Sequence, residues 1–338
     1  MYVDVALDSI ITYAITVGAS DIHFDPILNG IQVRLRIDGL LTEYMLVDAT
    51  DADMLVNRIK VFSGMDISEK RLPQDGRWEW SVKSYAVTMR VSSLPSLYGE
   101  AIVCRLMGNE GVHKNLLELG MDVELQEKIA ALLKRPYGLI TICGPTGSGK
   151  TATLYAMLRM LNLKETKLIC LEDPVEATIE GAIQIGINEK IGFTFSKGLR
   201  TVLRQDPDSI MIGEIRDNET AQLAVKAALT GHRVITTVHT NTALGVIDRL
   251  VDMGVEPYLL HATLIGSLSQ RLVRRIDSTT HSYQGRLGLF EYLEIPFSDI
   301  DWDHVEQYMF TSLQDSAHLA INSGITTLEE VHRAGILL

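Results

Sequence analysis

The amino-acid sequence predicts an α/β protein with two domains. At 338 residues the chain is about twice the usual size of one domain. Its first part combines amphipathic helices with strands in which apolar and polar residues alternate, as in a sheet with one buried face. The rest contains short, continuously apolar strands separated by helices, which indicates a parallel sheet covered on both faces.

Residues 1–106 are predicted to form a small α/β domain. In the segment 31–37 apolar residues alternate with polar ones, and Asn-Gly and Asp-Gly turn signals flank it. Residues 107–115 are mostly polar, contain two glycines and are the predicted linker. The other elements expected here are helices near Val5–Val17 and Ala52–Phe62 and strands at Tyr85–Val91 and Ala101–Leu106.

Residues 116–338 are predicted to form the larger domain. Asp217 is expected to cap the helix that follows its third strand, and Gly231 is expected to end that helix. From Glu256 onward we expect a helical C-terminal region. The predicted buried strands are Leu139–Cys143, Leu168–Leu171, Ile210–Ile212 and Val234–Val238.

The bulk composition narrows the class of protein. Hydrophobic residues make up 46% of the chain and charged residues 22%, as in soluble globular proteins. No run of 18 or more apolar residues occurs, and Met1 to Ile10 do not resemble a signal peptide, so we expect a cytoplasmic protein. The formal net charge of −12 argues against nucleic-acid binding, because phosphates need compensating Lys and Arg.

The three cysteines are expected to be small core residues. Cys104, Cys143 and Cys170 each lie singly inside an apolar run, so local spacing offers neither a disulfide framework nor a zinc site.

A glycine-rich loop carries the strongest chemical signal. Residues 144–151 match the pattern G-x-x-x-x-G-K-[ST] and lie between a buried strand and a helix that begins near Ala152. Backbone N–H groups of such a loop converge on phosphates, Lys150 reaches the β- and γ-phosphates, and the Thr151 hydroxyl ligates Mg²⁺. The alternative is a chance glycine-rich turn. The predicted cofactor-binding residues here are Gly144, Pro145, Thr146, Gly147, Ser148, Gly149, Lys150, Thr151 and Ala152.

Two acidic segments follow predicted strands. Glu214 ends the segment 209–214, where a carboxylate would hold Mg²⁺ and the attacking water. Pro174 stops the strand before it, so Glu172 and Asp173 are expected to project toward the crevice, Glu172 as a general base and Asp173 as a metal ligand. Solvated acids at a sheet edge are the alternative. Which of Glu172 and Glu214 is the base stays open.

A histidine ends the fourth predicted strand of the larger domain. His239 is followed by Thr240 and Asn241, at the edge where the nucleotide would lie. It is placed to sense a γ-phosphate or to hydrogen-bond the catalytic acid. A purely structural histidine is the alternative.

Four motifs in this order resemble those of the type II secretion and type IV pilus assembly ATPases, including the competence pseudopilus ATPases. The resemblance covers nearly the whole chain and extends to segments outside the four motifs. Those motifs are GPTGSGKT (144–151, Walker A), LEDPVE (171–176, Asp box), RQDPDSIMIGEIRD (204–217, Walker B) and GHRVITTVHTN (231–241, His box). The further segments are ASDIHFDP (19–26), RIDG (36–39), PQDGR (73–77), RVSSLPSLYGE (90–100) and LSQRLVRRI (268–276).

This resemblance implies a PAS-like N-terminal domain, a mobile linker and a RecA-like P-loop domain, with six copies in a ring. Nucleotide would lie between the two domains, and Arg77, Arg90 and Arg105 would approach its phosphates. A permanently charged guanidinium can neutralise the γ-phosphate, although these arginines could equally be ordinary strand-face charges.

The chain departs from the family pattern after residue 276. Family members commonly carry a four-cysteine zinc subdomain there, whereas this sequence has no cysteine beyond Cys170, so no zinc is expected. It also starts at the PAS-like domain, without the extra N-terminal domain of many assembly ATPases.

The implied function is a hexameric, Mg-ATP-hydrolysing motor. It would act on an inner-membrane platform protein, and it would associate with the inner face of the cell membrane only through that partner. Two other classes remain open, a nucleotide-dependent scaffold or regulator and a DNA translocase on the same core. A kinase is less favoured, because no acceptor-binding lid is evident.

Overall fold

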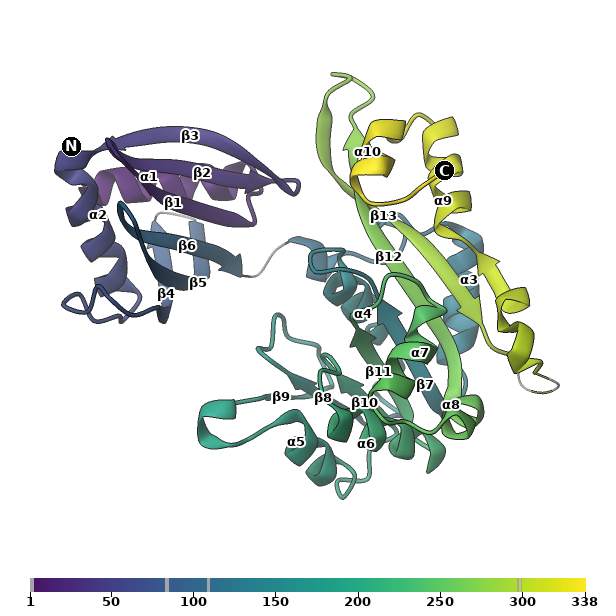
Figure 1. The fold of residues 1–338 in the computed structure, drawn as a ribbon. Coiled ribbons are helices and arrows are strands. Elements are labelled where there is room, and N and C mark those ends of the chain that lie inside the picture. The colour runs from purple at the N-terminus through teal and green to yellow at the C-terminus, as the bar shows by residue number, and fades with distance from the viewer. Residues whose placement is uncertain (1–2, 83–84, 108–109, 297, 299) are drawn as a thin grey trace. The chain divides into compact units, whose positions relative to one another are not determined.

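The computed structural model describes residues 3–82, 85–107, 110–296, 298 and 300–338. The chain divides into two compact units, with the boundary between residues 109 and 110 (Figure 1). The predicted linker, 107–115, includes residues 108 and 109, which lie outside the described residues.

The first unit is an antiparallel sheet with two helices on one face. Its six strands have the order β3-β2-β1-β6-β5-β4 (Figure 1). Helices α1 (Val3–Thr16) and α2 (Ala49–Phe62) contribute to the same apolar core as the inward side chains of the strands. The strands are β1 (Asp21–Ile27), β2 (Gly30–Ile37), β3 (Leu40–Asp48), β4 (Gln74–Val82), β5 (Tyr85–Ser96) and β6 (Gly99–Met107).

The predicted alternation in this unit is confirmed. Ile31, Val33 and Leu35 are buried in β2, whereas the polar residues that alternate with them, Gln32, Arg34 and Arg36, are only half-buried. Cys104 is buried in the same core, as expected. Strands β1, β3 and β4 were not predicted individually.

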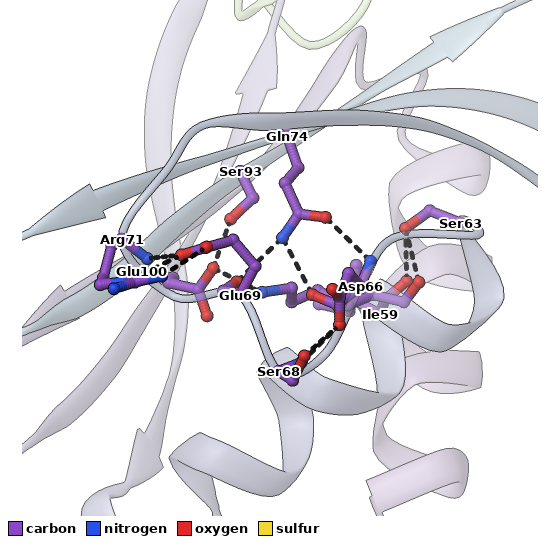
Figure 2. A network of polar contacts seen from close by, with 10 residues as sticks. Ile59, Ser63, Asp66, Ser68, Glu69, Arg71, Gln74, Ser93 and Glu100 are labelled. Atoms are coloured by element: carbon purple, nitrogen blue, oxygen red, sulfur yellow. Dashed lines mark hydrogen bonds and ion pairs between the residues drawn. The ribbon is translucent and has the colours of Figure 1, made fainter.

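A buried ion pair ties the segment between α2 and β4 to the sheet. Lys60 is fully buried, and its Nζ donates to Glu100 Oε1 at 2.8 Å and to the Glu69 carbonyl at 2.6 Å. Ser93 Oγ donates to the same Glu100 oxygen at 3.0 Å. Gln74 bridges the loop, because its Nε2 donates to the carbonyls of Asp66 and Glu69, both at 2.9 Å (Figure 2). This network fixes the chain that leads into the PQDGR segment.

The second unit contains an eight-stranded sheet with the order β14-β13-β12-β7-β11-β10-β8-β9. The strands from β12 to β9 are parallel, and β13 and β14 are antiparallel (Figure 1). All four predicted buried strands are confirmed. The strands are β7 (Gly138–Cys143), β8 (Leu168–Glu172), β9 (Ile183–Gly186), β10 (Ser209–Ile212), β11 (Arg233–Val238), β12 (Leu264–Ile276), β13 (Tyr283–Glu294) and β14 (Met309–Thr311).

Helices cover both faces of this sheet, as predicted. One apolar cluster packs α3 (Val123–Leu133) and α4 (Lys150–Leu158) against the strands. A second cluster does the same on the other face with α5 (Phe195–Val202), α6 (Asn218–Leu229), α7 (Gly245–Asp252) and α8 (Pro257–Thr263). Helices α9 (Leu313–Asn322) and α10 (Leu328–Arg333) pack on β12 and β13. Three short 3-10 helices lie at Glu110–His113, Glu189–Ile191 and Trp302–Tyr308.

Local signals in this unit acted as expected. The Asp217 carboxylate accepts a hydrogen bond from the Thr220 backbone N–H at 2.8 Å, so Asp217 caps α6. Cys143 and Cys170 are buried core residues. Within the described residues no helix is long and apolar enough to span a membrane.

The expected helical region from Glu256 onward is wrong for residues 264–276 and 283–294, which form β12 and β13. Strand β12 lies inside the sheet between β7 and β13 and is buried on both faces over most of its length. A strand of this kind shows no alternation, so its pattern cannot be distinguished from that of a buried helix. Pairing with β7 and β13 decides its conformation.

We predict that Glu100→Ala destabilises the first unit by about 3–5 kcal/mol, because it leaves the Lys60 ammonium buried without its carboxylate. Urea unfolding would measure the loss. The double variant Lys60→Met/Glu100→Leu should lose less, since no buried charge is left unpaired.

The matched control for this prediction is Asp4→Ala. It removes the exposed Arg58–Asp4 pair, with an N–O distance of 2.6 Å, and should change stability much less. Equal losses from Glu100→Ala and Asp4→Ala would contradict the prediction.

Candidate nucleotide-binding site

The glycine-rich loop connects the last residue of β7, Cys143, to the first residue of α4, Lys150. Gly144 has φ +145°, and a Cβ there would lie 2.5 Å from Ser148 Oγ and 2.6 Å from the Gln270 carbonyl oxygen. Gly149 precedes α4 with φ +90° and provides no side-chain cap. The first N–H groups of α4 are therefore left for an acceptor outside the helix, such as a phosphate.

Lys150 lies folded over this loop. Its side chain is buried, and Nζ donates to the carbonyls of Gly144 at 2.8 Å and Pro145 at 3.0 Å. Burial lowers the pKa of Lys150, and the negative charge of Glu214 opposes this effect. Pro145, Thr146 and Gly147 are exposed, whereas Thr151 and Ala152 are half-buried in the first turn of α4.

Parallel register brings the ends of neighbouring strands to the same level. Cys143 is paired with Val238 on β11 and with Ser269 on β12. Gly144 and His239 therefore leave the sheet side by side. The sequence placed these residues at strand ends, and the sheet order makes them neighbours.

Glu214, two residues beyond β10, lies between a histidine and an arginine. Its Oε2 is 3.4 Å from His239 Nε2, and its Oε1 is 2.6 Å from Arg216 Nη2. The Glu214 side chain is 18% exposed, so water can reach it. The hydrogen bond that Arg216 donates to Glu214 raises the pKa of Arg216. Arg216 was not singled out from the sequence, although it lies inside the Walker B segment.

Glu172 and Asp173 point in different directions, contrary to the expectation that both project toward the crevice. Asp173 is exposed, but Glu172 is only 4% exposed at the end of β8. The Tyr155 hydroxyl donates to Glu172 Oε2, and Gln184 Nε2 donates to Oε1 at 3.0 Å. Burial raises the pKa of Glu172. Successive side chains of a strand alternate sides, which explains the divergence.

Tyr155 is a further residue that sequence reasoning missed. Besides donating to Glu172, its hydroxyl accepts the backbone N–H groups of Glu176 and Ala177, both at 3.2 Å. It therefore connects α4, which follows the phosphate loop, to the Asp box. A tyrosine on an apolar helix face gave no signal beyond packing.

The oxygen-rich donors at this edge suit Mg²⁺. Thr151 offers a hydroxyl and Glu214 and Asp173 offer carboxylates, the hard oxygen ligands that Mg²⁺ prefers. The described residues contain no group of three or more His, Cys, Asp and Glu side chains that could hold a metal ion.

The three candidate arginines of the first unit form one row across its sheet. Arg77 pairs in register with Arg90, and Arg90 with Arg105. All three are exposed on the face opposite the helices. Arg105 Nε donates to Asp21 Oδ1 at 2.8 Å, and Arg77 lies 3.4 Å from Glu79. The row concentrates positive charge on one surface.

A parallel sheet of this order, a glycine-rich loop leading into a helix and acids at adjoining strand ends define a RecA-like P-loop nucleotide-binding protein. The family model described as "Type II/IV secretion system protein" matches residues 2–333. The chain belongs to this family.

Curated relatives agree with this family. The type II secretion system protein E of Klebsiella pneumoniae is 49% identical over 270 residues, which are 80% of this chain and 54% of that protein. The type II secretion system ATPase E of Vibrio cholerae is 40% identical, over 97% of this chain and 74% of that protein. The chain thus spans about half the length of several of the relatives it matches.

Solved structures share the fold. The pilus retraction motor PilT with bound ADP is 29% identical, with a TM-score of 0.69, and the match covers 96% of each chain. The ATPase DotB of Legionella pneumophila has a TM-score of 0.77 over 97% of this chain and 95% of that chain, at 23% identity.

The raised pKa of Glu172 predicts a pH dependence of stability. A carboxyl group that binds its proton more tightly when folded contributes stability below its unfolded pKa, near 4.5, and loses this contribution as the pH rises through the raised folded value. Glu172→Gln cannot ionise, so the free energy of unfolding of the variant should fall less than that of the wild type over this window. Urea unfolding at a series of pH values would measure it, and identical slopes would refute the prediction.

Proposed function

We propose that this chain is a Mg-ATP-hydrolysing motor subunit of a secretion or pilus machine. The observation that carries the proposal is the phosphate loop with Lys150, next to the Glu214–His239 pair, in a chain of the type II/IV secretion family. The names of the relatives, which include a type II secretion system ATPase E and a pilus retraction motor, support it.

In this proposal Lys150 exchanges its carbonyl partners for the β- and γ-phosphate oxygens. Its amine lies within 3.0 Å of two loop carbonyls, so a small movement of a flexible side chain suffices. Thr151 and Glu214 would hold Mg²⁺, and Asp173 would add a carboxylate at the rim. When bound, Mg²⁺ would supply positive charge that offsets the charge developing on the phosphates.

We assign the general base to Glu214 and a supporting role to Glu172. Both oxygens of Glu172 accept hydrogen bonds from protein side chains, which leaves little room for a water. Glu214 is more exposed, and His239 at 3.4 Å can orient its carboxylate. Arg216 must release Glu214 Oε1 before that oxygen can bind the attacking water. Glu172 then fixes the end of β8 through Tyr155.

The arginine row of the first unit supplies further positive charge. Arg77, Arg90 and Arg105 lie in register on one exposed face, so they can meet a polyphosphate together. We propose that residues 1–106 and 116–338 act as two domains joined by the linker 107–115.

We further propose a ring of six subunits in the cytoplasm. The family supports this assembly, and the ring would reach the inner face of the cell membrane through a platform protein. Because the chain covers only about half of several relatives, the docking partner is inferred from the family alone.

The catalytic assignment predicts two variant phenotypes. Lys150→Ala should reduce steady-state ATP hydrolysis by at least about 100-fold, because the β- and γ-phosphates lose their cation. Glu214→Gln should slow hydrolysis to a similar extent while ATP stays bound. Phosphate release and binding of a fluorescent ATP analogue would measure the two effects.

Lys164→Ala and Glu180→Gln are the matched controls, since both side chains are exposed and lie outside the site. They should hydrolyse ATP at the wild-type rate. Unimpaired turnover by both site variants would remove the assignment. A platform protein that failed to stimulate the wild type would favour a scaffold over a motor.

A further inference from the structure

Gln270 is a polar residue in an apolar setting directly beneath the phosphate loop. It lies on β12 immediately after Ser269, the last residue of β12 that pairs with β7, and its side chain is fully buried. Leu268, two residues earlier, belongs to the apolar core under α4. A buried amide needs hydrogen-bond partners, so its presence here requires a reason.

The oxygen of this amide is bound to α4. Thr153 Oγ1, in the first turn of the helix, donates to Gln270 Oε1 at 2.7 Å, and Thr153 is itself fully buried. This hydrogen bond joins the helix that begins with Lys150 to the strand beside β7. A change in β12 is thereby transmitted to the position of the helix N-terminus.

The nitrogen of the amide faces the loop. A Cβ on Gly149 would lie 2.8 Å from Gln270 Nε2, so the amide packs against the loop backbone. Neither Nε2 nor the buried Ser148 Oγ has a hydrogen-bond partner among the described residues. Ser148 Oγ and the Gln270 carbonyl oxygen both lie within 2.6 Å of the Cβ position of Gly144. Two unsatisfied donors thus lie against the two glycines that frame the loop.

We infer that Gln270 is a positioning residue for the phosphate loop: its amide oxygen fixes α4 through Thr153, and its amide N–H₂ is the donor that holds the loop when a polyphosphate is bound. This inference rests on the proposed nucleotide site. It adds a residue from the LSQRLVRRI segment, which the site described above does not use. A buried donor without a partner is unfavourable. A loop conformation that places a backbone carbonyl within hydrogen-bonding distance of Gln270 Nε2 is therefore stabilised.

The role predicts a loss of nucleotide binding with little loss of chemistry. Gln270 does not touch Glu214 or the attacking water, so Gln270→Leu should raise KM for ATP about tenfold and leave kcat within about twofold. Thr153→Val, which removes the hydroxyl, should raise KM in the same direction, and Thr153→Ser should restore it. Steady-state hydrolysis and calorimetric ADP binding would measure both effects.

The variant Gln270→Glu tests the role of the amide nitrogen separately from that of the amide oxygen. Its carboxyl oxygen can still accept from Thr153, but the N–H₂ donor is gone, so KM should remain raised. It also keeps the inference testable if Gln270→Leu does not fold. The double variant Gln270→Leu/Thr153→Val should raise KM by less than the product of the single effects, because one interaction is removed twice.

Ser267→Ala is the control on the same strand. Ser267 is fully buried, and its hydroxyl also has no partner within the described part of the chain, but it is paired with Thr141 in the middle of β7. The variant Ser267→Ala should leave KM for ATP unchanged. Wild-type KM in Gln270→Leu or Gln270→Glu, or an equal KM rise in Ser267→Ala, would overturn the inference. Failure of the proposed function itself would appear separately, as turnover that survives Lys150→Ala.

Discussion

The candidate site depends on the parallel register of β7 with its two neighbours, β11 and β12. Cys143 opposes Val238 on one side and Ser269 on the other. The chain therefore leaves all three strands at one level, where the phosphate loop, His239 and Gln270 meet. A shift of one residue in either pair would move the inward side chains to the opposite face of the sheet and separate these groups.

Burial then distinguishes two acids that look alike in the sequence. Glu172 and Glu214 each follow an apolar parallel strand, but Tyr155 and Gln184 hold Glu172 inside the protein, whereas Glu214 stays accessible beside His239. Burial raises the pKa of Glu172 and also keeps its carboxyl group away from water. Lys60 and Glu100 are also buried, inside the first unit, and there each supplies the other's counter-charge.

Much of the fold was accessible from pattern alone. The glycine-rich turn between β7 and α4, the four buried strands beside it and the Asp217 cap follow from local rules of glycine, apolar runs and helix capping, and the structure has them. The long strands β12 and β13 were missed because no local sequence rule identifies them. Over most of β12 and the second half of β13 both faces are buried, so no periodicity separates strand from helix there, and only the neighbouring strands determine the conformation.

By itself the sequence determined the chemistry that is available: a loop built for phosphate, acids and a histidine at strand ends, and arginines in the first domain. Such features are local, because they need only a few consecutive residues with the right backbone freedom. Only the tertiary structure decided that Arg77, Arg90 and Arg105 share one row, that Glu172 turns inward to Tyr155, and that Gln270 lies under the loop. These relations join residues far apart in the chain, and sheet order and side-chain packing alone bring them together.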